Sequence, residues 1–212
     1  MLNRKIRIAI FASGGGTNLQ AILNAQEAGK IHSGEVCLVI VNRESAYAAE
    51  RAKKAGIKTV IITKKKTGSQ EAFEAAILKE LEKEKIELIV LAGFMNVLSE
   101  AFIRHYEKRM LNIHPSLLPS FGGQGFYGLL VHEKALERGV KVTGATVHYV
   151  NELVDGGEII MQKAVDVKDG DTPEELQLRV MHEAEWIIYP EAVEKVCAEM
   201  TAKEEQPCRK EE

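Results

Sequence analysis

Four short apolar runs, separated by helix-like stretches, constrain the fold of this chain more than any other feature. The runs are residues 6–12, 36–41, 59–62 and 88–92. They are rich in β-branched residues and apolar on successive positions, as strands buried on both faces are. Between them, apolar residues recur at helical spacing, as at Leu19, Ile22 and Leu23. This alternation predicts an α/β fold, doubly wound around a mostly parallel sheet.

The pattern changes in the C-terminal half. Two strand-like runs, 143–150 and 158–165, flank the dipeptide Asp155-Gly156, which is typical of hairpins. A final helix should begin at residues 172–175, Thr-Pro-Glu-Glu, which form a capping box with proline at the first helical position. Pro190 should end or kink that helix. The sheet is therefore expected to carry a C-terminal antiparallel hairpin.

The composition is that of an ordinary soluble globular protein. Of the 212 residues, 45% are hydrophobic and 28% charged, and the net charge is -3. This charge gives no case for nucleic-acid or membrane partners, so we expect small-molecule substrates and a monomer or homodimer. Scattered cysteines and the lack of a signal peptide favour the cytoplasm and no metal site. Residues 1–200 should form one domain, and the polar tail 201–212 should be disordered.

Asn112 and His114 are the first candidates for chemistry, because they stand at the expected end of a strand. Residues two apart on a strand face the same side, and Pro115 stops the strand. Ligands of open α/β sheets bind at this carboxyl edge. Asn112 offers a neutral N–H donor and His114 exchanges a proton near pH 7, which suits a transient oxyanion and a proton transfer. Alone, the pair is a weak signal, since a polar strand end with a solvated histidine is the more common arrangement.

A second candidate site follows the first run, where residues 13–18 read Ser-Gly-Gly-Gly-Thr-Asn. Glycines let the backbone approach a ligand, and a helix N-terminus presents free N–H groups. The stretch is neither a dinucleotide fingerprint, because Leu19 replaces glycine, nor a P-loop, because no Gly-Lys-Ser/Thr follows. We interpret it as a site for the phosphate of a substrate. The alternative is a plain strand-to-helix turn, which needs fewer glycines.

In their order and spacing, five segments resemble the phosphoribosylglycinamide formyltransferase family, over residues 6–190. They are residues 13–20 (SGGGTNLQ), 91–95 (LAGFM), 111–119 (LNIHPSLLP), 142–148 (VTGATVH) and 154–157 (VDGG). The resemblance implies that a formyl group passes from 10-formyltetrahydrofolate, the co-substrate, to the amine of glycinamide ribonucleotide in purine biosynthesis.

The resemblance also implies roles for single residues. The family's catalytic residues fall on Asn112, His114 and Asp155. Its ribonucleotide site falls on Gly16, Thr17, Asn18, Leu19, Gln20 and Glu185. Its folate pocket falls on Met95, Asn96, Val97, Leu98, Asn112, Asn151, Glu152, Leu153, Val154 and Asp155.

Several positions depart from the family pattern. Asn96 and Gln70 stand where arginine occurs in the family, which would weaken contacts to the acidic tail of folate. Leu130 and Trp186 each replace a histidine, and the loop 120–128 is longer than in some members. These changes bear on folate affinity and loop geometry, and they leave the three catalytic residue types in place.

Taken singly, some of these residues have plainer interpretations. Asp155 would be a hairpin turn residue, and His148 a structural histidine. Glu185, on an apolar helix stripe, would need either a ligand amine or a neighbouring Lys or Arg. The loop 120–128 is either a lid over the site or an inert surface loop.

Three other functions remain open. Formyltetrahydrofolate hydrolase and methionyl-tRNA formyltransferase use similar catalytic residues. The hydrolase family adds an N-terminal module and the tRNA enzyme a C-terminal domain, neither of which we expect here. A catalytically inert nucleotide-binding module would have no use for Asn112, His114 and Asp155 together.

Overall fold

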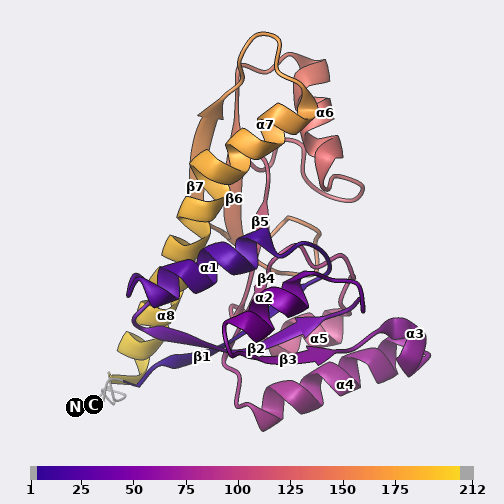
Figure 1. Ribbon diagram of the computed structural model, residues 1–212, viewed down its shortest axis with the longest axis vertical. Helices are drawn as coiled ribbons and strands as arrows, with labels where there is room; N and C mark the ends of the chain where they lie inside the picture. Colours follow the sequence, from indigo (N-terminus) through magenta and orange to yellow (C-terminus); the bar gives the residue numbers. More distant parts are fainter. Residues whose placement is uncertain (1–3, 206–212) are drawn as a thin grey trace, which may run out of the picture.

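The computed structural model describes residues 4–205 and places seven strands in one mixed sheet (Figure 1). They are β1 (Ile6–Ala12), β2 (Gly34–Val41), β3 (Lys58–Ile61), β4 (Leu88–Leu91), β5 (Met110–His114), β6 (Val142–Tyr149) and β7 (Ile159–Asp166). Their order across the sheet is β3-β2-β1-β4-β5-β6-β7. The first five strands are parallel, and β6 and β7 pair antiparallel. The expected doubly wound fold with a C-terminal antiparallel hairpin is confirmed.

The helices occupy the stretches between the strands. They are α1 (Thr17–Glu27), α2 (Ala48–Lys54), α3 (Lys64–Thr67), α4 (Gln70–Lys83), α5 (Glu100–His105), α6 (Leu129–Arg138), α7 (Pro173–Val180), the π-helical turn η1 (Met181–Glu185) and α8 (Trp186–Glu205). Thr172 and Glu175 form the expected capping box at the start of α7. Among residues 4–205, no helix is long and apolar enough to cross a membrane.

Both faces of the central strands β1 and β4 are buried, as the continuous apolar runs predict. Along β1, Ile8 and Ile10 pack into a core shared with α1, α7 and α8. Ala9 and Phe11 point to the opposite face, into a core shared with α4 and α5. The alternation of a strand thus fills two cores at once.

The strand order reverses between β1 and β4. The chain leaves β1 toward β2 and β3, then returns to β4 and β5 on the other side. In open α/β sheets this switch point is where the carboxyl ends of the strands bind ligands. The glycine-rich loop after β1 and the end of β5 both lie at this edge.

The last helix is longer than the sequence predicts. Of the two expected effects of Pro190, an end of the helix is not found, because α8 continues through the proline to Glu205. The π-helical turn η1 precedes α8, and prolines and π-helical turns are both usual sites of helix kinks. Residues 201–205, expected to begin a disordered tail, form the last turn of α8, and 206–212 lie outside the described residues.

Candidate active site

The antiparallel pairing of β5 with β6 brings the central side chains of the site together. Asn112 lies opposite His148, and His114 lies opposite Thr146. Thr146 accepts a hydrogen bond from the backbone N–H of Leu118 at 3.0 Å and donates to the carbonyl of Ser116 at 2.7 Å. These bonds fix the chain immediately after His114.

Asp155 links the two candidate residues of β5. Its Oδ2 lies 3.3 Å from Nδ1 of His114, and its Oδ1 lies 3.4 Å from Nδ2 of Asn112. Asp155 has a φ of 55°, in the left-handed region that turn residues such as Asp and Asn tolerate. It is therefore both the turn residue that the hairpin needs and a partner of both strand residues, so the plain turn interpretation is incomplete.

His114 lies between two hydrogen-bond acceptors. Its Nδ1 faces the Asp155 carboxylate at 3.3 Å, and its Nε2 lies 2.7 Å from the backbone carbonyl of Phe121. Both neighbours only accept hydrogen bonds, so a proton on either ring nitrogen of His114 has a partner.

Asp155 remains ionised despite its position. Burial by itself would raise the pKa of this carboxyl. The hydrogen bond from His148, the charge of His114 and the backbone N–H of Gly123 outweigh burial, and the pKa of Asp155 lies below its ordinary value. A fixed negative charge therefore lies beside the imidazole.

The loop 120–128 closes over these residues. Besides the contact between the Phe121 carbonyl and His114, the backbone N–H of Gly123 donates to Asp155 Oδ2 at 3.0 Å. A side chain at Gly122 would meet Leu118, since a β-carbon there would lie 2.2 Å from Leu118 Cδ2. The loop is thus part of the site, and the inert-surface interpretation is wrong.

His148 has a larger part in the site than the sequence indicates. Its Nδ1 lies 2.8 Å from the Tyr149 carbonyl. Its Nε2 lies 3.1 Å from Asn112 Nδ2 and 3.6 Å from Asp155 Oδ1, so it faces both side chains. His148 orients the amide of Asn112, and the only sequence signal for this role is its place in the β6 alternation.

His132 is a second histidine whose environment the sequence does not reveal. It lies in α6, and its side chain is only 1% exposed. Neither ring nitrogen has a hydrogen-bond partner among the described residues. Burial, together with the charge of His114, lowers the pKa of His132 to about 4, so it is neutral at physiological pH.

The glycine-rich loop has the geometry of an anion site. Gly16 is the N-cap of α1 and has a φ of 72°. Thr17 and Asn18 begin the helix, where backbone N–H groups have no partner within the helix. The side chain of Leu19 is fully buried in the core, so only its backbone can serve a ligand. Gln20 accepts a hydrogen bond from Arg51 Nη1 at 3.1 Å.

Two glycines of this loop give a matched test. A β-carbon at Gly16 would lie 2.8 Å from Ala48 Cβ and would force a strained φ, whereas one at Gly15 would meet nothing within 4 Å. We expect Gly16→Ala to lower the melting temperature by several degrees, on the scale of about 1 kcal/mol or more. We expect Gly15→Ala to leave it unchanged. Thermal unfolding of both variants measures this, and equal losses would contradict the geometry.

Glu185 lies in the π-helical turn η1 and is almost fully buried. Its Oε2 accepts a hydrogen bond from Asn18 Nδ2 at 2.9 Å, so its partner is a side-chain amide of the glycine-rich loop. No Lys or Arg forms an ion pair with it among the described residues, so of the two expected partners the neighbouring cation is not found. Burial raises the pKa of Glu185, and the Asn18 bond opposes this only in part. Single π-helical turns often occur at functional sites.

The raised pKa of Glu185 has a consequence for stability. Below the ordinary value of 4.5, the carboxyl is neutral in the folded and unfolded chain and costs nothing. As the pH rises from there through the folded pKa, the buried charge destabilises the fold. We expect Glu185→Gln to unfold at a higher temperature than the unmodified chain at pH 7, and the gap to close at pH 4. Melting curves at both pH values test this, and a variant that is less stable at pH 7 would refute it.

The expected folate-binding segments lie beside one core. Phe94 and Val150 pack against the same hydrophobic cluster, so the loops that follow β4 and β6 rest on one shared core. Val97 is 77% exposed and Leu153 is 70% exposed, and Met95 and Val154 are also exposed. Leu98 is instead buried and packs in the core. Exposed apolar side chains of this size are typical of binding surfaces.

Polar contacts hold these two loops in shape. Asn151 Oδ1 accepts from the Leu153 N–H at 3.1 Å, and Glu152 pairs with Arg104 of α5 at 3.1 Å. Gln70, at the start of α4, donates to the Val97 carbonyl at 3.1 Å. Gln70 therefore supports the 95–98 segment through a backbone contact and brings no charge there.

Comparisons with known proteins agree with this geometry. The family model described as formyl transferase matches residues 6–193. This chain belongs to the formyl transferase family. It is 39% identical over 197 residues to a chloroplastic phosphoribosylglycinamide formyltransferase of Arabidopsis thaliana, covering 92% of this chain and 67% of that protein. It is 45% identical over 194 residues to the trifunctional purine biosynthetic protein adenosine-3 of Gallus gallus, covering 92% of this chain but only 19% of that protein.

Solved structures of similar length also match this formyl transferase. The glycinamide ribonucleotide transformylase 1 of Symbiobacterium toebii is 43% identical and superposes with a TM-score of 0.86, covering 94% of this chain and 90% of that one. The phosphoribosylglycinamide formyltransferase of Brucella melitensis is 44% identical, with a TM-score of 0.84, covering 92% of this chain and 97% of that one.

Among residues 4–205, no group of three or more His, Cys, Asp or Glu side chains is placed to hold a metal ion.

Proposed function

We propose that this chain transfers a formyl group from 10-formyltetrahydrofolate to the amine of glycinamide ribonucleotide. The observation that carries the proposal is the joining of Asn112, His114 and Asp155, from segments about forty residues apart, within 3.4 Å at the carboxyl edge of the sheet. The names of the similar proteins support the same activity. We further propose that the chain acts as one domain on small molecules in the cytoplasm, as a monomer or homodimer.

The three side chains fit the steps of this transfer. The substrate amine attacks the formyl carbon and forms a C–N bond, and the carbonyl oxygen becomes an oxyanion. Asn112 and a protonated His114 can donate hydrogen bonds to this oxyanion. When the bond from the formyl carbon to the folate N10 breaks, the proton lost by the attacking nitrogen must reach N10. Asp155 and His114 can carry it.

The loop 120–128 must yield for this chemistry. In the structure, Nε2 of His114 is hydrogen-bonded to the Phe121 carbonyl, and the side-chain N–H of Asn112 donates to Asp155. An oxyanion would compete for both donors. The contact from Asn112 to Asp155 is the longer one at 3.4 Å and is the easier to give up.

The ribonucleotide would lie across the glycine-rich loop and Glu185. The free N–H groups at the start of α1 suit its phosphate. Glu185, hydrogen-bonded to Asn18, can accept hydrogen bonds from the glycinamide end.

Folate would lie against Met95, Val97, Leu153 and Val154. Its acidic tail would meet Asn96 and Gln70, neither of which carries a positive charge. We therefore expect this enzyme to gain little affinity from additional glutamates on the folate.

A substrate comparison tests the proposal. The purified chain is given 10-formyltetrahydrofolate with glycinamide ribonucleotide, with initiator methionyl-tRNA, or with water alone. We expect rapid loss of the formyl donor only with the ribonucleotide. Equal loss in water would indicate a hydrolase, formylation of the tRNA would indicate the tRNA enzyme, and no loss in any arm would indicate a binding module.

A further inference from the structure

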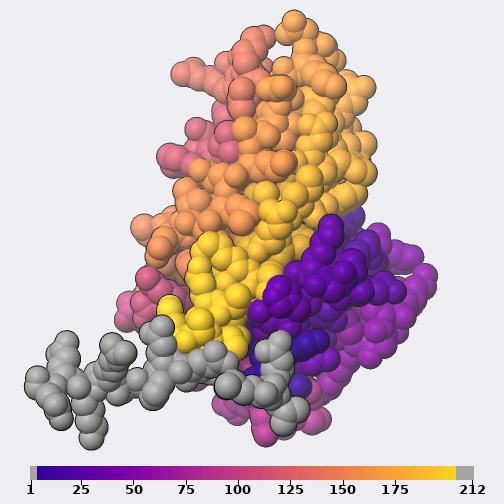
Figure 2. Space-filling view, turned by 90° about the vertical axis from the view of Figure 1, so that its left-hand side faces the viewer, coloured from indigo at the N-terminus to yellow at the C-terminus, as the bar shows by residue number. Residues whose placement is uncertain are grey.

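A groove with a volume of about 520 Å³ runs between α1 and the start of α8, away from the catalytic cluster. Figure 2 shows these two segments, indigo and yellow, side by side on one face of the molecule. The glycine-rich loop is at one end of the groove, where Thr17 lines it, and Lys30 is at the other. The formyl transfer derived above uses none of the groove beyond Thr17 and Gln20.

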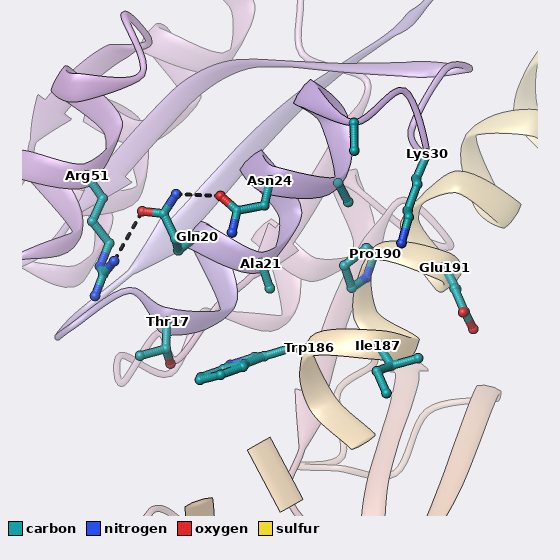
Figure 3. A pocket seen from close by; sticks show the side chains of 12 residues that line it. Thr17, Gln20, Ala21, Asn24, Lys30, Arg51, Trp186, Ile187, Pro190 and Glu191 are labelled. Atoms are coloured by element: carbon teal, nitrogen blue, oxygen red, sulfur yellow. Dashed lines mark hydrogen bonds between the residues drawn. The ribbon is translucent and has the colours of Figure 1, made fainter. Parts of the chain in front are cut away.

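The lining combines one aromatic face with small residues and amides (Figure 3). The indole of Trp186 and the methyl groups of Ala21 and Ala25 form its apolar surface. The side-chain amides of Gln20 and Asn24 are hydrogen-bonded to each other at 2.8 Å along one wall. A concave, largely apolar surface with a few converging polar groups is the usual form of a small-molecule site.

Two cations and one carboxylate line the groove: Lys30, Arg51 and Glu191. Neither Arg51 nor Lys30 takes part in an ion pair among residues 4–205, so the lining has one positive charge in excess. Arg51 instead donates to two neutral acceptors, the Gly15 carbonyl at 2.8 Å and Gln20 Oε1 at 3.1 Å. A guanidinium with only neutral partners can bind a phosphate with little loss, and phosphate suits its forked geometry.

We propose that this groove binds a nucleoside monophosphate at a site separate from that of the formyl acceptor. Its base lies on the Trp186 indole, because every base has a face that stacks on aromatic rings. Its polar edge meets the Asn24 amide, a side chain that can donate and accept together. Its phosphate meets Arg51.

The same arginine couples the groove to the phosphate loop. Arg51 Nε holds the Gly15 carbonyl, so a phosphate that draws Arg51 into the groove loosens the loop that cradles the substrate. Occupancy of the groove therefore weakens binding of glycinamide ribonucleotide by a finite factor, and the effect is reciprocal.

Trp186 gives a direct readout, because it is the only tryptophan of the chain. Titration with adenosine 5′-monophosphate should change its fluorescence saturably, with adenosine and ribose 5-phosphate each binding at least about tenfold more weakly. No saturable change with the monophosphate would overturn the proposal. Equal binding of ribose 5-phosphate would also overturn it, because the base would then contribute nothing.

Two exposed neighbours at the end of α1 give a matched pair of variants. Ala28 lines the groove and Glu27 does not, and both side chains are exposed, so a larger residue at either is tolerated by the fold. We expect Ala28→Phe to weaken adenosine monophosphate binding at least about tenfold and Glu27→Phe to leave it unchanged. Equal behaviour of the two variants would place the ligand elsewhere.

Competition distinguishes this site from the substrate site. In calorimetry, the affinity for glycinamide ribonucleotide should fall as adenosine monophosphate is raised and then reach a plateau. The ribonucleotide should therefore still bind the chain that is saturated with adenosine monophosphate. Complete displacement without a plateau would mean that the monophosphate merely occupies the substrate site. These binding measurements require no formyl transfer, so they stand or fall independently of the proposed activity.

Discussion

A His114→Asn variant is expected to fold normally and to turn over roughly 10²–10⁴ times more slowly than the unmodified chain. The imidazole lies between the Asp155 carboxylate and the Phe121 carbonyl, two hydrogen-bond acceptors that orient the ring. Asparagine retains a polar group of similar reach, but it cannot take up or release a proton near pH 7. Turnover measured together with the melting temperature separates loss of chemistry from loss of fold.

His105 provides the matched control for this substitution. It is an exposed histidine at the end of α5, outside the cluster at the carboxyl edge. His105→Asn should keep both turnover and stability. A folded His114→Asn protein with near-normal turnover would remove this imidazole from the mechanism.

The Asp155→Asn variant is expected to fold with nearly unchanged stability and to lose at least about 10²-fold in turnover. Asparagine tolerates the φ of 55° at this position as well as aspartate does, so the hairpin keeps its shape. What disappears is the charge 3.3 Å from His114, which the depressed pKa of Asp155 keeps present at neutral pH. Steady-state kinetics and thermal unfolding on one protein preparation measure both effects.

Glu158 lies three residues later, just before β7, and tests for a general effect of charge. Its exposed carboxylate pairs with Lys108 at 3.2 Å, outside the cluster and outside the expected binding sites, and Glu158→Gln should leave turnover within about threefold, as expected for the loss of one exposed ion pair. If Asp155→Asn were as active as Glu158→Gln, Asp155 would be a turn residue without a part in the chemistry.

The sequence alone predicts the sheet well, because each strand is indicated by residues that are consecutive in the chain. The strands 6–12, 36–41 and 88–92 are recognised by continuous apolar runs, and the start of α7 by its capping box. The same local evidence misplaces the end of the last helix. A π-helical turn has no periodic signature in a short segment, and its effect on Pro190 depends on the hydrogen bonds that it shifts.

The sequence predicts which residue types take part in the site, but it does not predict the contacts between them. Asn112 and His114 are candidates from their place at a strand end, and Asp155 comes from the resemblance; the structure places the three side chains together. The role of His148 follows from the cross-strand register, which the sequence does not reveal.

Other contacts of the site join distant parts of the chain. The pairing of Asn18 with Glu185 spans 167 residues, and the sequence indicates only that a buried Glu185 needs some partner. The carbonyl of Phe121 contributes through the backbone, and residue identity carries little information about such a contact.

The fate of the formyl carbon tests the central claim most directly. The chain is mixed in excess with 10-formyltetrahydrofolate labelled with ¹³C at the formyl group and with glycinamide ribonucleotide, and a single turnover is followed by NMR. The account predicts that the label leaves folate and appears only as the formamide of the ribonucleotide, at a rate reduced at least about 10²-fold in Asp155→Asn. Label that appears as formate, or that moves equally fast in Asp155→Asn, would contradict it.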